Sequence, residues 1–221
     1  MGSLTFSAQY LQRPVPLEGN LIKRDWFKWY DNAPSRVSGV EIVQSWDVAS
    51  TTGETNDWSV CTTWLVEKRI YSLLDVWCGR LEFPHLRQKL IALAGEHKPN
   101  RILIEQVGPG LHLIQDFIAN PVAGVPMPIG IKPEGDKRVR MEAQSARFEA
   151  RQVHLPKEAP WLSAFLHEML AFPMARHDDQ IDSVSQFLNW AESHFRPMSF
   201  APPGVFTRPR EDWFDYSRYY R

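Results

Sequence analysis

The hydrophobic positions between residues 40 and 78 fall into three short runs separated by polar breaks. Residues 40–49 (VEIVQSWDVA), 58–66 and 70–78 are rich in β-branched and aromatic side chains, and residues 51–56 and 67–69 separate them. Runs of this composition are typical of β-strands, and strands that follow one another closely pair antiparallel. The pattern therefore predicts a three-strand antiparallel meander.

Beyond residue 80 the period of the hydrophobic positions changes. Leu86, Leu90 and Leu93 recur every three to four residues, which predicts a helix. Residues 101–107 (RILIEQV) form a short, almost wholly apolar run, as expected of a strand covered on both faces. A helix near 111–118, a strand at 128–132 and a helix at 136–150 follow. These are consecutive βα units.

The remaining pattern completes the predicted domain. Residues 153–155 are predicted to form a small hairpin or an edge strand, and residues 161–170 a helix. The final helix is expected at 178–194, with Ile181, Val184, Leu188 and Ala191 on its packing face. A meander followed by βα units predicts an α/β fold with a mixed sheet and helices on both faces.

The two ends of the chain have no sustained hydrophobic period. Residues 1–36 are aromatic and broken by proline, and we expect them to form an arm or linker outside the domain at 37–196. Residues 197–221 combine prolines with a crowd of Arg and Tyr, which predicts an extended tail. No internal repeat is visible.

Composition fits one folded domain. The chain has 221 residues, is 43% hydrophobic and carries a net charge of −1, so any nucleic-acid contact would come from local basic clusters. Cys61 and Cys78 lie in apolar runs and are interpreted as small core residues in a reducing compartment. No apolar stretch approaches the ~20 residues that span a bilayer, and a cytoplasmic location is expected.

Acidic residues stand at three corresponding places in the pattern. Asp47 and Glu105 each end an apolar run, and Asp178, Asp179 and Asp182 open the last helix. If the two strands are neighbours, their carboxylates meet at one edge of the sheet. Each acid alone has an ordinary explanation as a turn former, a partner of an arginine or a helix cap. Their conjunction indicates a metal site, because partly buried carboxylates are costly without a cation or hydrogen bonds.

The ligand chemistry narrows the choice of metal ion. Oxygen ligands without a cysteine or histidine set favour Mg²⁺ or Mn²⁺ over zinc. Two such ions roughly 3.5–4 Å apart can activate a water and stabilise the leaving oxygen of a phosphodiester. The acids therefore predict phosphodiester hydrolysis with two divalent cations.

A basic cluster surrounds the predicted helix start near residue 136. It contains Lys132, Lys137, Arg138 and Arg140, next to Gly135. Basic side chains and free N–H groups at a helix start can hold a phosphate, and Lys137 is the preferred contact. The alternative is a solvated helix face.

Four sequence blocks at these residues resemble one family. They are SWDVAS around Asp47, ILIEQVGPG around Glu105, GDKRVRMEA from Gly135 and HDDQIDSVSQ from His177. In order and context they resemble the C-terminal nuclease domain of the large terminase subunit of tailed phages, an RNase H-like fold. The resemblance spans about residues 9 to 192, and YLQRPVPLEG is similar to the segment that joins the family's ATPase and nuclease domains.

The resemblance implies roles and partners. It implies that Asp47, Glu105 and Asp179 bind metal, with Asp178 as a further candidate, and Asp182 matches the second helix acid of Holliday-junction resolvases. It also implies an endonuclease that cuts concatemeric double-stranded viral DNA during packaging in the bacterial cytoplasm. The implied partners are the ATPase domain, the small terminase subunit and the portal. The ranking of Asp178 against Asp182 stays open.

Departures from related families leave alternatives. The chain has no G-x-x-x-x-G-K-[ST] phosphate loop, so no ATPase activity is assigned, and both an excised domain and a stand-alone relative remain open. A DEDD-type exonuclease expects glutamate where Ala49 stands, and a transposase core generally ends with glutamate on the last helix. A resolvase-like nuclease is the main alternative. A catalytically idle binding module is disfavoured by the intact acids.

Overall fold

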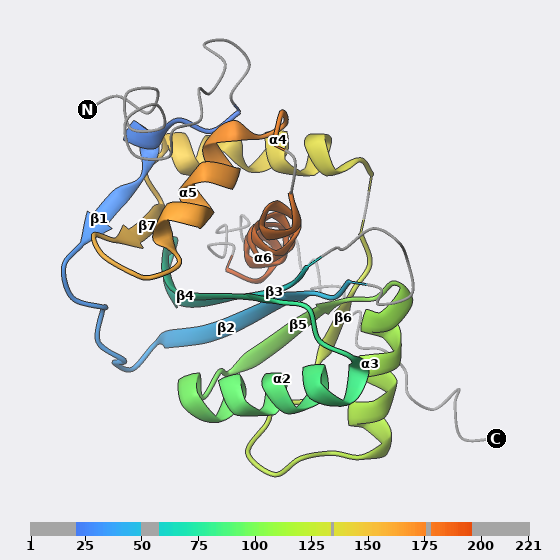
Figure 1. Ribbon diagram of the computed structural model, residues 1–221. Coiled ribbons are helices and arrows are strands. Elements are labelled where there is room, and N and C mark those ends of the chain that lie inside the picture. Colours follow the sequence, from blue (N-terminus) through green and yellow to red (C-terminus); the bar gives the residue numbers. More distant parts are fainter. Residues whose placement is uncertain (1–20, 50–57, 134, 176–177, 196–221) are drawn as a thin grey trace, which may run out of the picture.

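A seven-stranded mixed sheet organises the computed structural model, which describes residues 21–49, 58–133, 135–175 and 178–195 (Figure 1). The strand order is β1-β7-β4-β3-β2-β5-β6. The strands are β1 (Lys28–Tyr30), β2 (Val40–Asp47), β3 (Ser59–Glu67), β4 (Ile70–Gly79), β5 (Arg101–Glu105), β6 (Ile129–Ile131) and β7 (Val153–Pro156). The helices are η1 (Arg24–Trp26), α2 (Phe83–His97), α3 (Gly108–Ala119), α4 (Lys137–Glu149), α5 (Leu162–Ala171) and α6 (Asp179–His194).

The predicted meander and βα units are confirmed. Strand β3 pairs antiparallel with both β2 and β4, and β5 adds to β2 in parallel. The two parallel additions β5 and β6 follow from helices α2 and α3, because a parallel strand requires a crossover connection. Strand β2 consequently lies inside the sheet, with its last residue, Asp47, at the edge where β5 also ends.

Helices cover both faces of the sheet, as the pattern predicts (Figure 1). Helices α4, α5 and α6 lie on one face, and α2 and α3 lie on the other. Side chains of a strand alternate between faces, so Val43 of β2 enters the core under α6, whereas Trp46 enters the core under α2. By the same alternation, Asp47 belongs to the α6 face.

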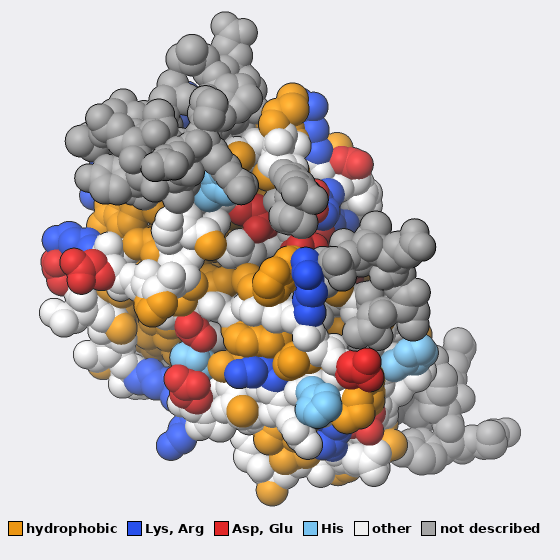
Figure 2. Space-filling view, viewed as in Figure 1, with side chains coloured by type: hydrophobic (Ala, Val, Ile, Leu, Met, Phe, Trp, Pro, Cys, Tyr) orange, Lys and Arg blue, Asp and Glu red, His pale blue; other side chains and the backbone are white. Residues whose placement is uncertain are grey.

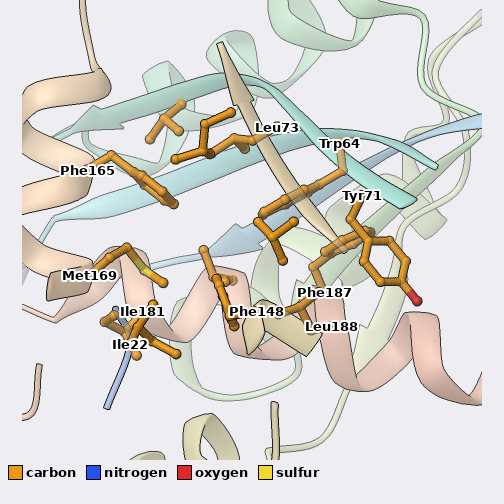
Figure 3. Packing of buried hydrophobic residues seen from close by; sticks show 14 of the residues in the cluster. Ile22, Trp64, Tyr71, Leu73, Phe148, Phe165, Met169, Ile181, Phe187 and Leu188 are labelled. Carbon is orange, nitrogen blue, oxygen red and sulfur yellow. The ribbon is translucent and has the colours of Figure 1, made fainter. Parts of the chain in front are cut away.

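Helix α6 is fixed to the sheet by aromatic and aliphatic packing. The rings of Trp64 and Phe187 stack with centroids 4.5 Å apart, and Tyr71 meets Phe187 edge-on at 5.6 Å (Figure 3). The predicted packing face of α6 is confirmed, since its four members are fully buried: Ile181, Val184, Leu188 and Ala191.

The strand at residues 153–156 corrects one prediction. The sequence predicts a hairpin or an edge there, but β7 lies between β4 and β1 and pairs in parallel with both. The reason is β1, a three-residue strand with polar and aromatic side chains that carries too little periodicity to be recognised in the sequence. Trp29 pairs with Leu155, and the Tyr30 hydroxyl donates to the Leu73 carbonyl at 2.5 Å.

The described part of the predicted N-terminal arm packs within the domain. Ile22 is fully buried and lies beside Ile181 and Met169 (Figure 3). Phe27 is 3% exposed and meets Phe148 edge-on at 5.5 Å. These residues contribute core rather than lying outside it, although a connection to an ATPase domain stays a prediction. Residues 1–20 and the predicted tail at 197–221 lie outside the described residues.

Two smaller expectations have different outcomes. Cys61 is buried, as predicted for a core residue, but Cys78 is exposed, because β4 ends at Gly79 and leaves the sheet edge uncovered there. Both thiols are free. Within the described ranges, no helix has the length and apolar character needed to cross a bilayer.

The packing of Ile22 gives a stability prediction. Ile22→Ala is expected to lower the free energy of unfolding by about 2–5 kcal/mol, since it removes a fully buried side chain and leaves a cavity. Urea denaturation followed by tryptophan fluorescence measures this. Val37→Ala is the control, because Val37 is 59% exposed and its truncation should change stability by less than about 0.5 kcal/mol. Equal stability of Ile22→Ala and wild type would show that this segment is not part of the folded unit.

Candidate active site

A row of side chains crosses the sheet under the start of α6. Asp47 pairs with Val60, which pairs with Cys78, and on the other side Glu105 pairs with Ile131. Asp47 and Glu105 are one position beyond Trp46 and Ile104, the last pair of β2 and β5. Residues directly opposite one another share a face of the sheet. Asp47 and Glu105 therefore stand next to each other on the α6 face.

A buried hydrogen-bond network fixes α6 above this row. Ser45 and Ser183 are joined reciprocally, each hydroxyl donating to the other residue's carbonyl at 2.9 and 2.8 Å. The Thr62 hydroxyl lies 2.7 Å from that of Ser183, and Gln186 Nε2 donates to the Ser45 hydroxyl at 2.9 Å and to the Trp46 carbonyl at 3.2 Å. The small side chains of Ser45, Thr62 and Ser183 let the helix approach the sheet closely. The network sets which turn of α6 lies over Asp47.

Asp47 and Glu105 lie close enough to other acids for the pKa of each to be raised. Burial raises the pKa of Asp47 well above its usual range, and Asp182, Glu105 and Asp179 raise it further. Burial also raises the pKa of Glu105, together with the charge of Asp182, while Arg140, Lys137 and a hydrogen bond with Asp47 lower it. Like charges a few Å apart disfavour the ionised forms. The sequence-predicted acids from β2, β5 and α6 thus form one electrostatic cluster.

Cations from α4 neutralise the outer part of this cluster. Lys137 Nζ lies 2.7 Å from an Asp178 carboxylate oxygen and 2.5 Å from one of Asp182. The Arg140 guanidinium donates to the other Asp182 oxygen at 2.8 Å. Asp182 is only 12% exposed, and both of its carboxylate oxygens are paired with these cations. Figure 2 shows acidic and basic side chains gathered around the start of α6.

The other predicted basic residues lie at the margin. Arg138 is 62% exposed and pairs with Glu142 at 2.8 Å, one turn along α4. Lys132 is exposed after β6. Asp136 caps α4 by accepting from the Arg138 backbone N–H at 2.8 Å. Helix α4 thus presents Lys137 and Arg140 to the acids and Arg138 to solvent.

Glu168 of α5 holds the first turn of α6 and was not identified from the sequence. Its Oε1 accepts from the backbone N–H groups of Gln180 and Ile181 at 2.6 and 3.2 Å, and its Oε2 accepts from Gln180 Nε2 at 2.6 Å. The side chain of Asp178, at the N-cap position, makes no capping hydrogen bond within α6. Burial raises the pKa of Glu168 to about 7, opposed by the Gln180 hydrogen bonds. In the sequence Glu168 is one acid within a helical run, with no sign of its partner.

A glycine allows α3 to start close behind Glu105. A Cβ placed on Gly110 would lie 2.1 Å from the Glu105 carbonyl oxygen, so any larger residue would displace the backbone that carries this acid. Gly108 begins α3 with φ +49°, a left-handed conformation that glycine adopts without strain. The glycine-rich turn after Glu105 therefore has a steric role at the site.

The donor set fits a divalent cation. Hard carboxylate oxygens from three elements lie close together, and burial followed by neighbouring negative charge raises the pKa of Asp47 and of Glu105, which a dication would offset. Among the residues that the structure describes, no three His, Cys, Asp or Glu side chains already stand as a ligand set. Asp182 is instead held by Lys137 and Arg140.

The fold and this cluster define an RNase H-like α/β domain with an acidic centre. A family model described as "Terminase RNaseH-like domain" matches residues 44–190, about two thirds of the chain, and the chain belongs to that family. The matched range begins within β2 and ends within α6, and it includes every acid of the cluster.

Solved structures share the fold at low sequence identity. The zinc-bound large terminase nuclease of thermophilic phage G20c matches with a TM-score of 0.56 and 14% identity over 76% of this chain and 95% of that one. The large terminase of a second thermophilic bacteriophage gives 0.55 and 10%, covering 77% of this chain and 44% of that one. The human cytomegalovirus terminase nuclease domain gives 0.52 and 10%, covering 69% and 82%. No curated protein matches significantly.

The crowded acids give a pH prediction. Because the pKa values of Asp47 and Glu105 are raised on folding, their contribution to stability is present below the unfolded values near 4 and is lost as pH rises through the folded values. In EDTA, Asp47→Asn should therefore melt about 2–4 °C above wild type at neutral pH, the shift of about 1 kcal/mol in a domain of this size. The difference should disappear toward pH 4.

Differential scanning fluorimetry across pH measures this difference. Glu96→Gln is the control, because it removes one exposed carboxylate from α2 on the opposite face. A lower melting temperature for Asp47→Asn at neutral pH would contradict the proposed charge crowding.

The cap on α6 gives a separate prediction. Glu168→Leu should lower the free energy of unfolding by about 1–3 kcal/mol, because it leaves the buried N–H groups of Gln180 and Ile181 without their acceptor. Glu168→Gln keeps a carbonyl acceptor and should lower the free energy of unfolding by less. Urea unfolding of the two variants compares them, and equal losses would show that the hydrogen bonds are not the cause.

Proposed function

We propose that this domain is a divalent-metal-dependent endonuclease that hydrolyses phosphodiester bonds of double-stranded viral DNA during genome packaging. The observation that carries the proposal is the convergence of Asp47, Glu105, Asp179 and Asp182 from β2, β5 and α6, close enough for the charges of the other three to raise the pKa of Asp47. Membership in the terminase RNaseH-like family supports a nuclease role in packaging. G20c nuclease structures described with bound zinc, magnesium and cobalt support the use of divalent metal.

Two Mg²⁺ or Mn²⁺ ions are the proposed cofactors, with Asp47, Glu105 and Asp179 as their ligands. Bound there, the ions would supply an activated water and stabilise the charge that develops on the leaving oxygen. The protein's part is to hold three carboxylates on rigid elements, two at strand ends and one in the first turn of a helix. The raised pKa values of Asp47 and Glu105 imply that proton release accompanies metal binding.

Asp182 is a better candidate for the additional acid than Asp178. Of the charges that raise the pKa of Asp47, that of Asp182 is the largest, and Asp182 is also the charge that raises the pKa of Glu105. Asp178 contributes to neither and has a side chain 42% exposed, turned toward Lys137. We infer that Asp182 joins the inner cluster, whereas Asp178 helps to hold Lys137.

Lys137 and Arg140 have two proposed tasks. They pair with Asp182, and a bound metal ion would take over part of that charge balance. Their side chains would then be available to DNA phosphates beside the acids. Arg138 and Lys132 are proposed outer contacts. An ATPase domain, the small terminase subunit and the portal remain proposed partners, and the host cytoplasm is the proposed location.

A nicking assay tests the function. Wild-type protein with Mn²⁺ should convert supercoiled plasmid to nicked and linear forms, and Asp47→Asn, Glu105→Gln and Asp179→Asn should each reduce the rate at least about 10²-fold, because each removes a metal-binding charge. Glu96→Gln is the matched control on the opposite face and should cut like wild type. Wild-type inactivity with both Mg²⁺ and Mn²⁺ would favour a binding module.

Substrate choice and metal binding complete the test. A four-way junction cut faster than linear duplex would favour a resolvase-like enzyme instead. Millimolar Mn²⁺ should raise the melting temperature of wild type more than that of Asp47→Asn, since a ligand that binds only the folded state stabilises it. Equal melting curves with and without Mn²⁺ would contradict metal binding.

A further inference from the structure

The basic residues closest to the acids are already occupied. Lys137 is shared by Asp178 and Asp182, and Arg140 is paired with Asp182. Both cations come from the first turn of α4, and both act on Glu105 at the end of β5. A DNA backbone that crosses the site also passes the opposite side, over β3 and β4.

Arg80 and Trp58 stand on that opposite side. In the antiparallel pairing of β3 and β4, Val60 lies opposite Cys78, and Ser59 lies opposite Gly79. Trp58 and Arg80 are the next residues of the two chain segments, so they follow this last pair. By strand alternation they share the face of Val60 and Asp47. Two residues along a strand correspond to roughly 7 Å, so the pair lies beyond Val60 and Cys78 in the direction in which β2 ends, with Trp58 one strand and Arg80 two strands across from Asp47.

The arginine is held and yet free to bind an anion. Its guanidinium carbon lies 4.5 Å from the centroid of the Trp58 ring, and Trp58 in turn packs against the core under α6. Arg80 is exposed, and within the described part of the chain no carboxylate lies at ion-pair distance from it. Stacking on an aromatic ring orients a guanidinium while leaving its N–H groups for a phosphate.

A similar cation–π pair lies on the other face of the sheet and serves as a control for position. Lys89 lies over Trp77 at 5.6 Å, and Trp77 pairs with Cys61 on the α2 side of the sheet, where it contacts Trp46. The two pairs have the same kind of cation–π contact. Only the pair formed by Arg80 shares a face with the acids.

We propose that Arg80, oriented by Trp58, binds a backbone phosphate of the DNA next to the one that is cut. This inference rests on the proposed nuclease function and extends it to the substrate's path. The duplex then contacts cations on both sides of the acidic row. Lys137 and Arg140 of α4 lie on one side, and Arg80, next to the end of β4, lies on the other. The contact is to phosphate, so it carries no sequence preference.

Binding measurements over a range of salt concentration test the contact. Fluorescence anisotropy of a labelled linear duplex, with Ca²⁺ in place of Mn²⁺ to limit cutting, gives the slope of log Kobs against log salt for each protein. Loss of one phosphate contact should reduce the magnitude of this slope by about 0.9 in Arg80→Gln. Lys89→Gln should keep the wild-type slope, and Arg80→Lys should restore most of it because the charge remains.

The outcomes distinguish this inference from the function on which it rests. An unchanged slope in Arg80→Gln, or an equal loss in Lys89→Gln, would overturn the Arg80 contact. If wild type at the same time nicks plasmid and Asp47→Asn does not, the nuclease proposal stands without that contact. If wild type neither nicks plasmid nor binds duplex, the proposed function itself is wrong. Unchanged melting temperatures of the two glutamine variants would show that neither effect arises from misfolding.

Discussion

The buried hydrogen bonds between β2 and α6 determine the geometry on which the site depends. Ser45, Thr62, Ser183 and Gln186 satisfy one another in a place that excludes water, so a shift of the helix along the sheet would leave several of these groups unpaired. Unpaired buried polar groups cost about 1–3 kcal/mol each. The apolar packing of Trp64 on Phe187 holds α6 against the sheet, whereas the polar groups fix the position of α6 along the strands.

Register matters here because the site is divided among elements that are distant in sequence. The fixed helix places Asp182 over Asp47 and Glu105, and the Glu168 cap ties the same turn to α5. The resulting crowd of carboxylates is unfavourable by itself. Lys137 and Arg140 pair with Asp182 and offset part of this negative charge.

The surroundings of the acids are asymmetric. On the β5 side, cations from α4 are engaged with the acids, whereas on the β4 side a single arginine rests on a tryptophan, with no carboxylate partner among the described residues. A DNA duplex would thus meet an available arginine on the β4 side. On the β5 side it would meet cations that must first leave their carboxylate partners. Under the proposed function, DNA binding and metal binding would be linked through the same carboxylates.

The sequence by itself determined the meander, the βα units, the inward face of α6 and the identity of the acids, because periodicity and strand-end position are local signals. It did not reveal β1, whose three residues form a strand only against β7, or the inner place of β7. Glu168 and Arg80 also escaped notice, since each gains its role from partners brought near by folding. The tertiary structure decided these points because strand order, helix register and charge pairing depend on contacts between distant residues.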